Sequence, residues 1–162
     1  MARTQGRTRR GAPVADNDDA REDSGSRDET FAGPYEAVMT VLADYFDGLY
    51  ESDAAKLGRV FHVNAIYACA TDGTLLFRRM DEYLPIVAKR PSPASRHETR
   101  DDKILSIEFA GPVTALARVQ CAIGEKAFTD LLSLIHVDDR WQIISKVFHY
   151  DLRSVSASNP NP

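Results

Sequence analysis

The C-terminal third of the 162-residue chain constrains the fold most, because it holds four strand-forming segments joined by very short turns. The segments are 104–109, 114–123, 128–137 and 141–150, with Gly111-Pro112, Gly124 and Asp138-Asp139 between them. Connections of so few residues join antiparallel neighbours, since parallel strands need a long crossover. This part of the chain therefore predicts an antiparallel meander.

The chain before the meander begins with helical periodicity. Apolar residues repeat at spacings of three and four from Val38 to Leu49, which predicts an amphipathic helix. Pro34 suits the first turn of that helix, where its missing N–H costs nothing. Either Ser52 or Asp53 can cap a second, short helix.

A hairpin and a third helix follow. Residues 62–70 and 74–78 are rich in strand formers and are separated by the turn residues 71–73. Asp81 can cap a third helix, which ends before Arg90-Pro91 because the residue preceding proline avoids helical geometry. Three helices, a hairpin and a meander predict an α+β fold in which a curved antiparallel sheet packs on three N-terminal helices.

The two ends of the chain differ in composition from the middle. Residues 1–33 contain almost no large apolar side chains before Phe31, only Met1 and Val14, and are rich in charges, so we expect a disordered tail. Residues 34–152 form the predicted pocket domain. Residues 153–162 are expected to be a flexible C-terminal tail.

Composition excludes several classes of function. The net charge of −4 and the pI near 5.5 argue against broad binding to nucleic acid or a membrane surface. Cys69 and Cys121, the two cysteines, have no metal-ligand spacing. No apolar run is long enough for a membrane span, and no nucleotide-binding or zinc-hydrolase motif occurs. We expect a cytoplasmic protein without a cofactor or a metal.

The last hairpin contains a candidate catalytic pair. If Asp138-Asp139 is a two-residue turn, Asp130 lies opposite Val147 and diagonal to His149. An aspartate on an apolar face needs a partner, so this register predicts an Asp130–His149 hydrogen bond. Such a pair could abstract a proton or orient a water molecule.

Two alternatives bear on these polar residues. A register changed by one residue would place Asp130 beside Lys146 or Phe148, and an Asp–Lys bridge would replace the Asp–His pair. His62 lies where the second helix meets the first strand, and its pKa near neutrality suits acid–base chemistry. A histidine at a helix end can equally serve only to bind carbonyl groups.

Several local sequences together form a recognisable pattern: YFDGLY at 45–50 and the residues at 61–62, 90–93, 101–107, 128–130, 132–134, 140–141 and 146–148. This pattern resembles the putative lumazine-binding family of the nuclear-transport-factor-2-like superfamily. The resemblance covers residues 35–150 and implies a cone that is open at one end and dimeric through its sheet. Related families include ketosteroid isomerase, scytalone dehydratase, limonene epoxide hydrolase, SnoaL-like polyketide cyclases and non-catalytic binding proteins.

The resemblance assigns possible roles to two residues. Tyr45 matches the helix tyrosine that stabilises the oxyanion in ketosteroid isomerase, although it could equally be a core tyrosine. Cys69 lies near the position of that enzyme's general-base aspartate, and residues 62–70 contain no carboxylate. The isomerase constellation is therefore incomplete in this chain.

These observations lead to one leading hypothesis and one alternative. The leading hypothesis is a cofactor-independent isomerase, dehydratase-type lyase or polyketide-cyclase-like enzyme that uses acid–base chemistry on a small hydrophobic or aromatic ligand. The alternative is a non-catalytic ligand-binding module or a dimeric scaffold. The candidate catalytic residues are Asp130, His149, His62 and Tyr45, and the candidate ligand-binding residues are Tyr67, Cys69, Trp141, Ser145 and Lys146.

Overall fold

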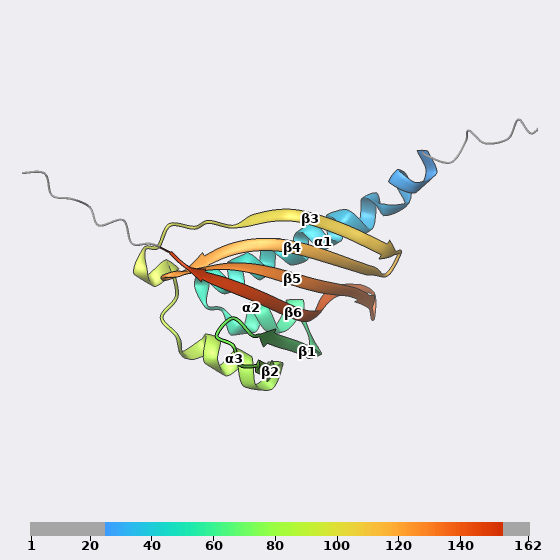
Figure 1. The fold of residues 1–162 in the computed structure, drawn as a ribbon. Coiled ribbons are helices and arrows are strands. Elements are labelled where there is room, and N and C mark those ends of the chain that lie inside the picture. The colour runs from blue at the N-terminus through green and yellow to red at the C-terminus, as the bar shows by residue number, and fades with distance from the viewer. Residues whose placement is uncertain (1–24, 154–162) are drawn as a thin grey trace, which may run out of the picture.

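The computed structural model describes residues 25–153, which form helices, one 3-10 turn and a single sheet (Figure 1). In chain order the elements are α1 (Gly25–Glu51), α2 (Ala54–Val60), β1 (Phe61–Cys69), β2 (Leu76–Arg79), α3 (Met80–Lys89), η1 (Ala94–Arg96), β3 (Lys103–Gly111), β4 (Thr114–Ile123), β5 (Lys126–Val137) and β6 (Arg140–Leu152). No helix in this part of the chain is long and apolar enough to cross a membrane.

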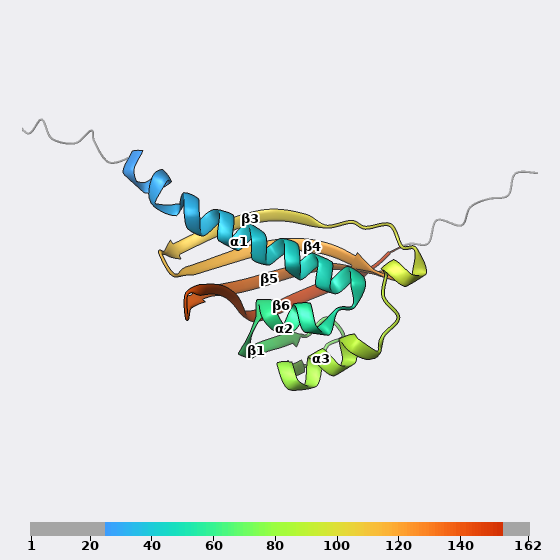
Figure 2. The same ribbon diagram turned by 180° about the vertical axis from the view of Figure 1, so that it is seen from behind.

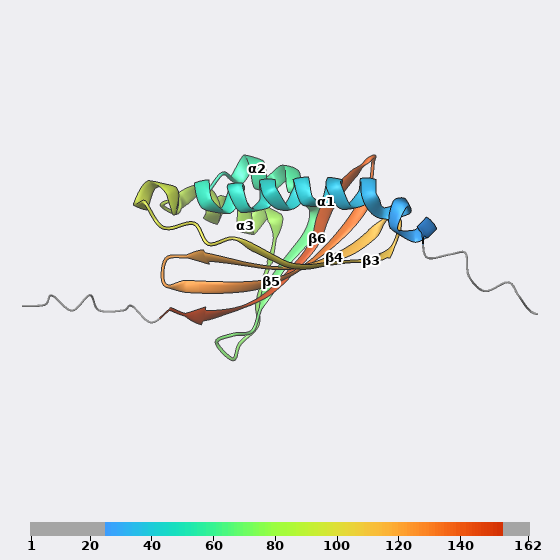
Figure 3. The same ribbon diagram turned by 90° about the horizontal axis from the view of Figure 1, so that it is seen from above.

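The six strands form one sheet in the order β2-β1-β6-β5-β4-β3. The predicted meander is confirmed, since β3, β4, β5 and β6 pair as consecutive antiparallel neighbours. The first hairpin joins the sheet by a parallel pairing of β1 with β6. The three helices lie together on one face of the curved sheet, and no helix among the described residues covers the other face (Figures 2 and 3). The predicted α+β fold is therefore confirmed.

Two helix starts differ from the predictions. Helix α1 begins at Gly25, so Pro34 lies inside it rather than in its first turn. Helix α3 begins directly after β2, and the Arg79 N–H donates to a Glu82 carboxylate oxygen at 3.0 Å. Asp81 therefore lies in the first turn and is not the cap, because the strand enters the helix two residues earlier.

The predicted tails fall mostly outside the described residues. This holds for residues 1–24 and 154–162. Of the predicted N-terminal tail, residues 25–33 form the start of α1. Arg153 of the predicted C-terminal tail donates through its backbone N–H to the Glu125 carbonyl at 2.7 Å.

A close contact between α1 and α2 fixes the helical layer. A Cβ atom at Gly48 would lie only 2.7 Å from Cδ2 of Leu57, so the absence of a side chain allows this approach. The Asp53 side chain caps α2 as predicted, accepting from the Lys56 N–H at 2.8 Å. The apolar core then lies between the helices and the covered sheet face, and Tyr45 is part of it.

Candidate functional site

The turn between β5 and β6 sets the starting register of the site. Asp138 and Asp139 have φ of 50° and 58°, as a two-residue hairpin turn requires. Val137 consequently pairs with Arg140, as predicted.

The register then changes within the hairpin. Leu134 pairs with Ile143, but Ser133 pairs with Ser145, so Ile144 is an extra residue in β6. This is a β-bulge. Since side chains alternate between the two faces of a strand, one extra residue exchanges the faces of everything beyond it.

The bulge turns Lys146 and Phe148 toward the core and leaves Val147 and His149 exposed. Asp130 pairs with Phe148, so the predicted pairing with Val147 is wrong. The predicted Asp130–His149 hydrogen bond does not form between these described residues. The alternative register, with Asp130 beside Lys146 and Phe148, is confirmed, and its cause is the bulge rather than the turn length.

Three polar side chains from three elements meet in the core. The Tyr45 hydroxyl, from α1, donates to Oδ2 of Asp130 on β5 at 2.7 Å. The Lys146 ammonium, from β6, donates to the same oxygen at 3.0 Å and to the Tyr45 hydroxyl at 2.6 Å. The exposed fractions are 0% for Tyr45, 0% for Asp130 and 3% for Lys146. We call these residues the Tyr–Asp–Lys cluster.

Burial and charge together set the protonation of the cluster. Burial is the largest single effect on the pKa of Lys146 and would lower it, but the charge of Asp130, together with smaller contributions from Tyr83, Cys121 and Tyr67, raises it by more. The side chain therefore stays an ammonium. Burial, with the adjacent Asp130 charge, raises the pKa of Tyr45 well above its ordinary value, so the phenol keeps its proton. The Lys146 Nζ also lies 5.1–5.7 Å from four aromatic ring centroids, of Tyr45, Tyr67, Phe128 and Phe148.

One atom of the cluster is left unsatisfied. Oδ1 of Asp130 is buried and makes no hydrogen bond within the described part of the chain. An unpaired buried acceptor costs about 1–3 kcal/mol. The Cys121 Sγ lies 4.0 Å from the other oxygen, Oδ2, and burial raises the pKa of this thiol to about 12. The carboxylate is thus satisfied on the side of Tyr45 and Lys146 only.

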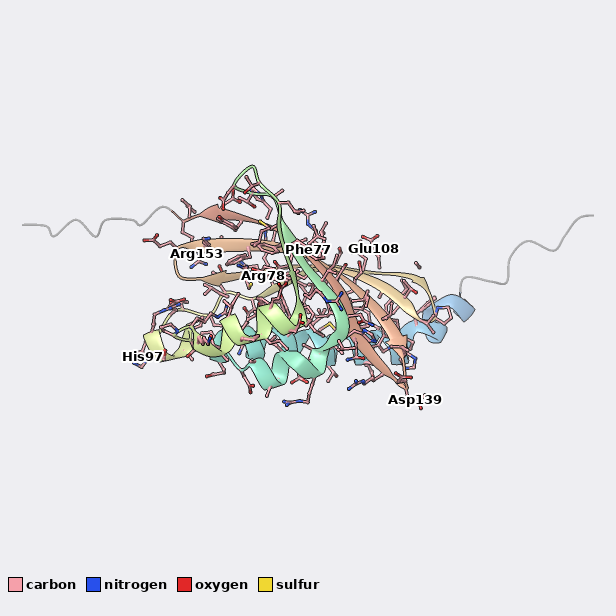
Figure 4. All side chains as sticks on the ribbon, turned by 90° about the horizontal axis from the view of Figure 1, so that it is seen from below. Phe77, Arg78, His97, Glu108, Asp139 and Arg153 are labelled. Carbon is pink, nitrogen blue, oxygen red and sulfur yellow. The ribbon has the colours of Figure 1, made fainter. Side chains whose placement is uncertain are left out.

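A small pocket with an enclosed volume of about 20 Å³ lies against the Lys146 end of the cluster. Its lining residues are Leu49, Tyr67, Tyr83, Arg90, Cys121, Ile123, Phe128 and Lys146. The pocket lies where α1 and α3 end and β5 begins. This end of the molecule carries His97 and Arg153, and the turn at Asp139 lies at the opposite end (Figure 4). This volume is little more than one water molecule needs, so the pocket accepts a small group of a ligand whose remainder lies outside it.

Four of the residues predicted from sequence belong to this region. Tyr45, Asp130 and Lys146 form the cluster, and Tyr67 lines the pocket. Tyr67 stacks on Tyr83 with ring centroids 4.3 Å apart.

The two candidate histidines lie elsewhere. The Nδ1 atom of His62 accepts from the Asn64 N–H at 3.1 Å on the surface. The His149 ring contacts the Thr71 hydroxyl at 3.0 Å and is exposed. Neither ring lines the pocket, because His62 lies at the other end of β1 and the bulge turns His149 outward.

Three predicted ligand contacts also lie outside the pocket lining. Trp141 is buried beside the β5–β6 turn, where its ring meets Phe109 edge-on at 5.8 Å. Ser145 faces the same way as Val147, on the uncovered side of the sheet. The Cys69 thiol is satisfied locally by the Thr71 N–H at 3.3 Å.

Sequence analysis missed six residues of the pocket lining: Leu49, Tyr83, Arg90, Cys121, Ile123 and Phe128. In the sequence Arg90 appeared as the end of the third helix and within a family-like segment, and Cys121 appeared as one of two cysteines without metal-ligand spacing. Their common position follows from how α3 and the start of β5 meet, for which the sequence has no local signal. In residues 25–153, no group of three or more His, Cys, Asp or Glu side chains could hold a metal ion.

Comparison with known proteins gives a consistent family. The sequence model of the family described as Putative lumazine-binding matches residues 34–149. Aldolase FrzH from a Cladobotryum species is 22% identical over 117 residues, which cover 71% of this chain and 90% of that protein.

Two solved structures show the shared fold. An NTF2-like protein of unknown function from Silicibacter pomeroyi aligns with a TM-score of 0.65 and 22% identity, covering 74% of this chain and 98% of the other. A ketosteroid isomerase-like protein from Erwinia carotovora aligns with a TM-score of 0.59 and 10% identity, again covering 74% and 98%.

Proposed function

The chain belongs to the Putative lumazine-binding family, within the NTF2-like superfamily, and we propose that it is an enzyme that acts on the carbonyl group of a small metabolite. The observation that carries this proposal is the buried Lys146 ammonium, held by Asp130 and Tyr45 at the wall of a pocket. A preorganised cation in a site with little water stabilises negative charge that develops on a carbonyl oxygen. Isomerases and lyases that break a bond next to a carbonyl both develop such charge.

The hydrogen bonds of the cluster support a division of roles. Two of the three N–H donors of Lys146 bind Tyr45 and Asp130, which leaves one for a carbonyl oxygen in the pocket. Lys146 is then the residue that contacts the substrate, and as a permanently charged ammonium it stabilises the oxyanion that forms when a water molecule takes up the α-proton. Tyr45 and Asp130 are positioning residues, because they fix the ammonium and its charge before the substrate binds.

The known activities of similar proteins are compatible with this chemistry. An aldolase makes or breaks a carbon–carbon bond next to a carbonyl, and the relative from Cladobotryum is an aldolase. The pocket is lined by aromatic and aliphatic side chains, which favours a hydrophobic or aromatic substrate. We therefore favour a lyase or isomerase over a hydrolase.

A second candidate function is ligand binding without turnover. Lys146 and Asp130 already satisfy each other, and the pocket is small. A cluster of this kind could hold a ligand and leave its covalent bonds unchanged. The two candidates differ in whether a bond next to the carbonyl becomes labile.

Exchange of α-protons distinguishes enzyme from binding module. Small ketones and 2-oxo acids are incubated with the protein in deuterium oxide, and loss of their α-proton signals is followed by proton NMR. We expect at least one compound to exchange faster with the wild type than with Lys146→Gln. Lys103→Gln, at an exposed lysine on β3, is the matched control and should behave as the wild type.

Tyr45→Phe extends this test to a variant of nearly unchanged shape. It removes the hydroxyl that binds Asp130 and Lys146, so the exchange rate should fall while the circular dichroism spectrum is retained. Binding of a compound by the wild type with no exchange above that of Lys146→Gln would establish the binding module instead.

The uncovered face of the sheet supports a proposal about assembly. Leu131, Val147, Ala68 and Phe77 are paired across four strands and form one apolar row on the face without helices, and Arg118 lies at the end of this row. Leu131, Val147 and Phe77 are 43%, 45% and 51% exposed. A contiguous apolar row on an uncovered sheet favours association with a second copy of the chain. We therefore propose a homodimer through this face.

Sedimentation velocity tests the homodimer. The wild type should sediment as a dimer, and Leu131→Arg should shift it to a monomer by placing a charge in the row. Ile86→Arg, at a 45% exposed position on α3, should leave the dimer intact. A monomeric wild type at micromolar concentration would contradict the proposal.

A further inference from the structure

Arg90 has donors that the fold does not use. Its Nε donates to the Ser52 hydroxyl at 3.0 Å, and its Nη2 donates to the Leu49 carbonyl at 3.2 Å. These bonds take two of the five N–H donors of the guanidinium and leave three. The side chain is half-buried, lines the pocket, and forms no ion pair with a residue in the described range.

The charges around the pocket do not balance. Two of its lining residues are cations, Lys146 and Arg90. Asp130 neutralises Lys146 at 3.0 Å, but no carboxylate from residues 31–153 lies within ion-pair distance of Arg90. One positive charge therefore remains uncompensated. Such a charge attracts an anion more strongly in a partly buried pocket than on an open surface.

Neutral donors lie in the same pocket. The hydroxyls of Tyr67 and Tyr83 make no hydrogen bond with another described residue, although both side chains line the pocket. Burial raises the pKa of Tyr67 to about 12, and it raises the pKa of Tyr83 as well, so both phenols stay protonated. The pocket thus offers N–H and O–H donors to a ligand that only accepts, such as a carboxylate.

We propose that Arg90 binds the carboxylate of the substrate, so that the enzyme acts on a small, singly charged oxo acid whose carbonyl lies at Lys146. Arg90 is then the residue that determines specificity, and a guanidinium suits this role because its parallel N–H groups match the two oxygens of a carboxylate. The position of the carbonyl rests on the proposed function. Anion binding at Arg90 does not, since it follows from the uncompensated charge and the unused donors.

Benzoate and benzamide test the anion site, because they have nearly the same shape and only benzoate is charged. Affinities are measured by protein NMR titration and by thermal shift at low salt. The wild type should bind benzoate at least about tenfold more tightly than benzamide, as expected for one charge-assisted hydrogen-bonded pair. Equal affinities, or no binding of either compound, would overturn the inference.

Two variants assign the preference to Arg90. Arg90→Gln should lose the preference for benzoate, whereas Arg90→Lys should keep part of it, because it keeps the charge without the paired donors. Ser52→Ala is the control for structure, since it removes one of the bonds that hold Arg90 and leaves the charge in place. Retention of the full preference by Arg90→Gln would refute the assignment.

The two hypotheses fail separately. Preference for benzoate that depends on Arg90, together with no α-proton exchange by any compound, would leave the anion site and remove the proposed reaction. Exchange of neutral ketones that is as fast as exchange of 2-oxo acids, with no benzoate preference, would leave the reaction and remove the anion site.

Discussion

Replacing Asp130 with asparagine tests the ion pair on which the cluster depends. The substitution keeps the size of the side chain and an oxygen that accepts from the Tyr45 hydroxyl, but it removes the negative charge 3.0 Å from the Lys146 ammonium. Lys146 is only 3% exposed, so its charge would stay buried without a counterion. Removing one partner of a buried ion pair costs about 3–5 kcal/mol, and we expect this loss in the free energy of unfolding.

The double variant Asp130→Asn, Lys146→Met separates the ion pair from the loss of packing. It removes both charges, and an apolar replacement of a buried pair is often close to neutral. We therefore expect the double variant to be more stable than Asp130→Asn alone. A double-mutant cycle compares the wild type, Asp130→Asn, Lys146→Met and the double variant. The interaction free energy from these four proteins should be at least about 2 kcal/mol.

Urea unfolding at neutral pH measures all four proteins. The fluorescence of Trp141, the single tryptophan, reports the core, and far-ultraviolet circular dichroism reports the backbone. Equal slopes against urea would show that the variants unfold from equally compact states. A loss below about 1 kcal/mol for Asp130→Asn, or additive effects in the double variant, would refute a desolvated, coupled pair.

Three further predictions concern stability. Gly48→Ala should cost about 1–3 kcal/mol in urea unfolding, because its Cβ would overlap Leu57, whereas Gly58→Ala, with no neighbour closer than 3.5 Å, should be stabilising by about 0.5–1 kcal/mol. Asp53→Ala should cost about 1 kcal/mol by removing the cap of α2, and an unchanged urea midpoint would contradict this. The pKa of Lys146 is higher in the folded protein than the value of about 10.4 expected in the unfolded chain. This difference contributes its full stabilisation below a pH of about 10.4, so stability should fall as the pH rises above that value. The decrease should be smaller in Lys146→Met but still present, because Tyr45, Tyr67, Tyr83 and Cys121 also have raised pKa values and lose stability in the same range. An equal decrease in both proteins would show that Lys146 makes no contribution.

Much of the fold can be predicted from the sequence because its signals are local. The apolar spacing from Val38 to Leu49 specifies a helical face, and the Asp138-Asp139 pair specifies a two-residue turn. Each depends only on neighbouring residues, whose backbone preferences act within a few positions. Helix starts are less certain, and Pro34 and Asp81 were each placed at the wrong helix position for that reason.

The candidate site could be predicted only in part. Asp130 was identified because a carboxylate among apolar residues needs a partner, and that requirement is visible in the sequence. Its partner could not be chosen between His149 and Lys146, since the two registers differ by a single residue. Tyr83 and Arg90 reach the pocket through the packing of α3, which no local pattern encodes.

The sequence by itself therefore determined the α+β class, the meander and the need of Asp130 for a partner. The tertiary structure decided which partner it has. Ile144 is the extra residue that turns Lys146 inward and His149 outward. A bulge forms where packing on both faces of the sheet favours it, so its position depends on residues that are distant in sequence. One of these residues is Ile66 on β1, which pairs in parallel with Ser145 next to the bulge.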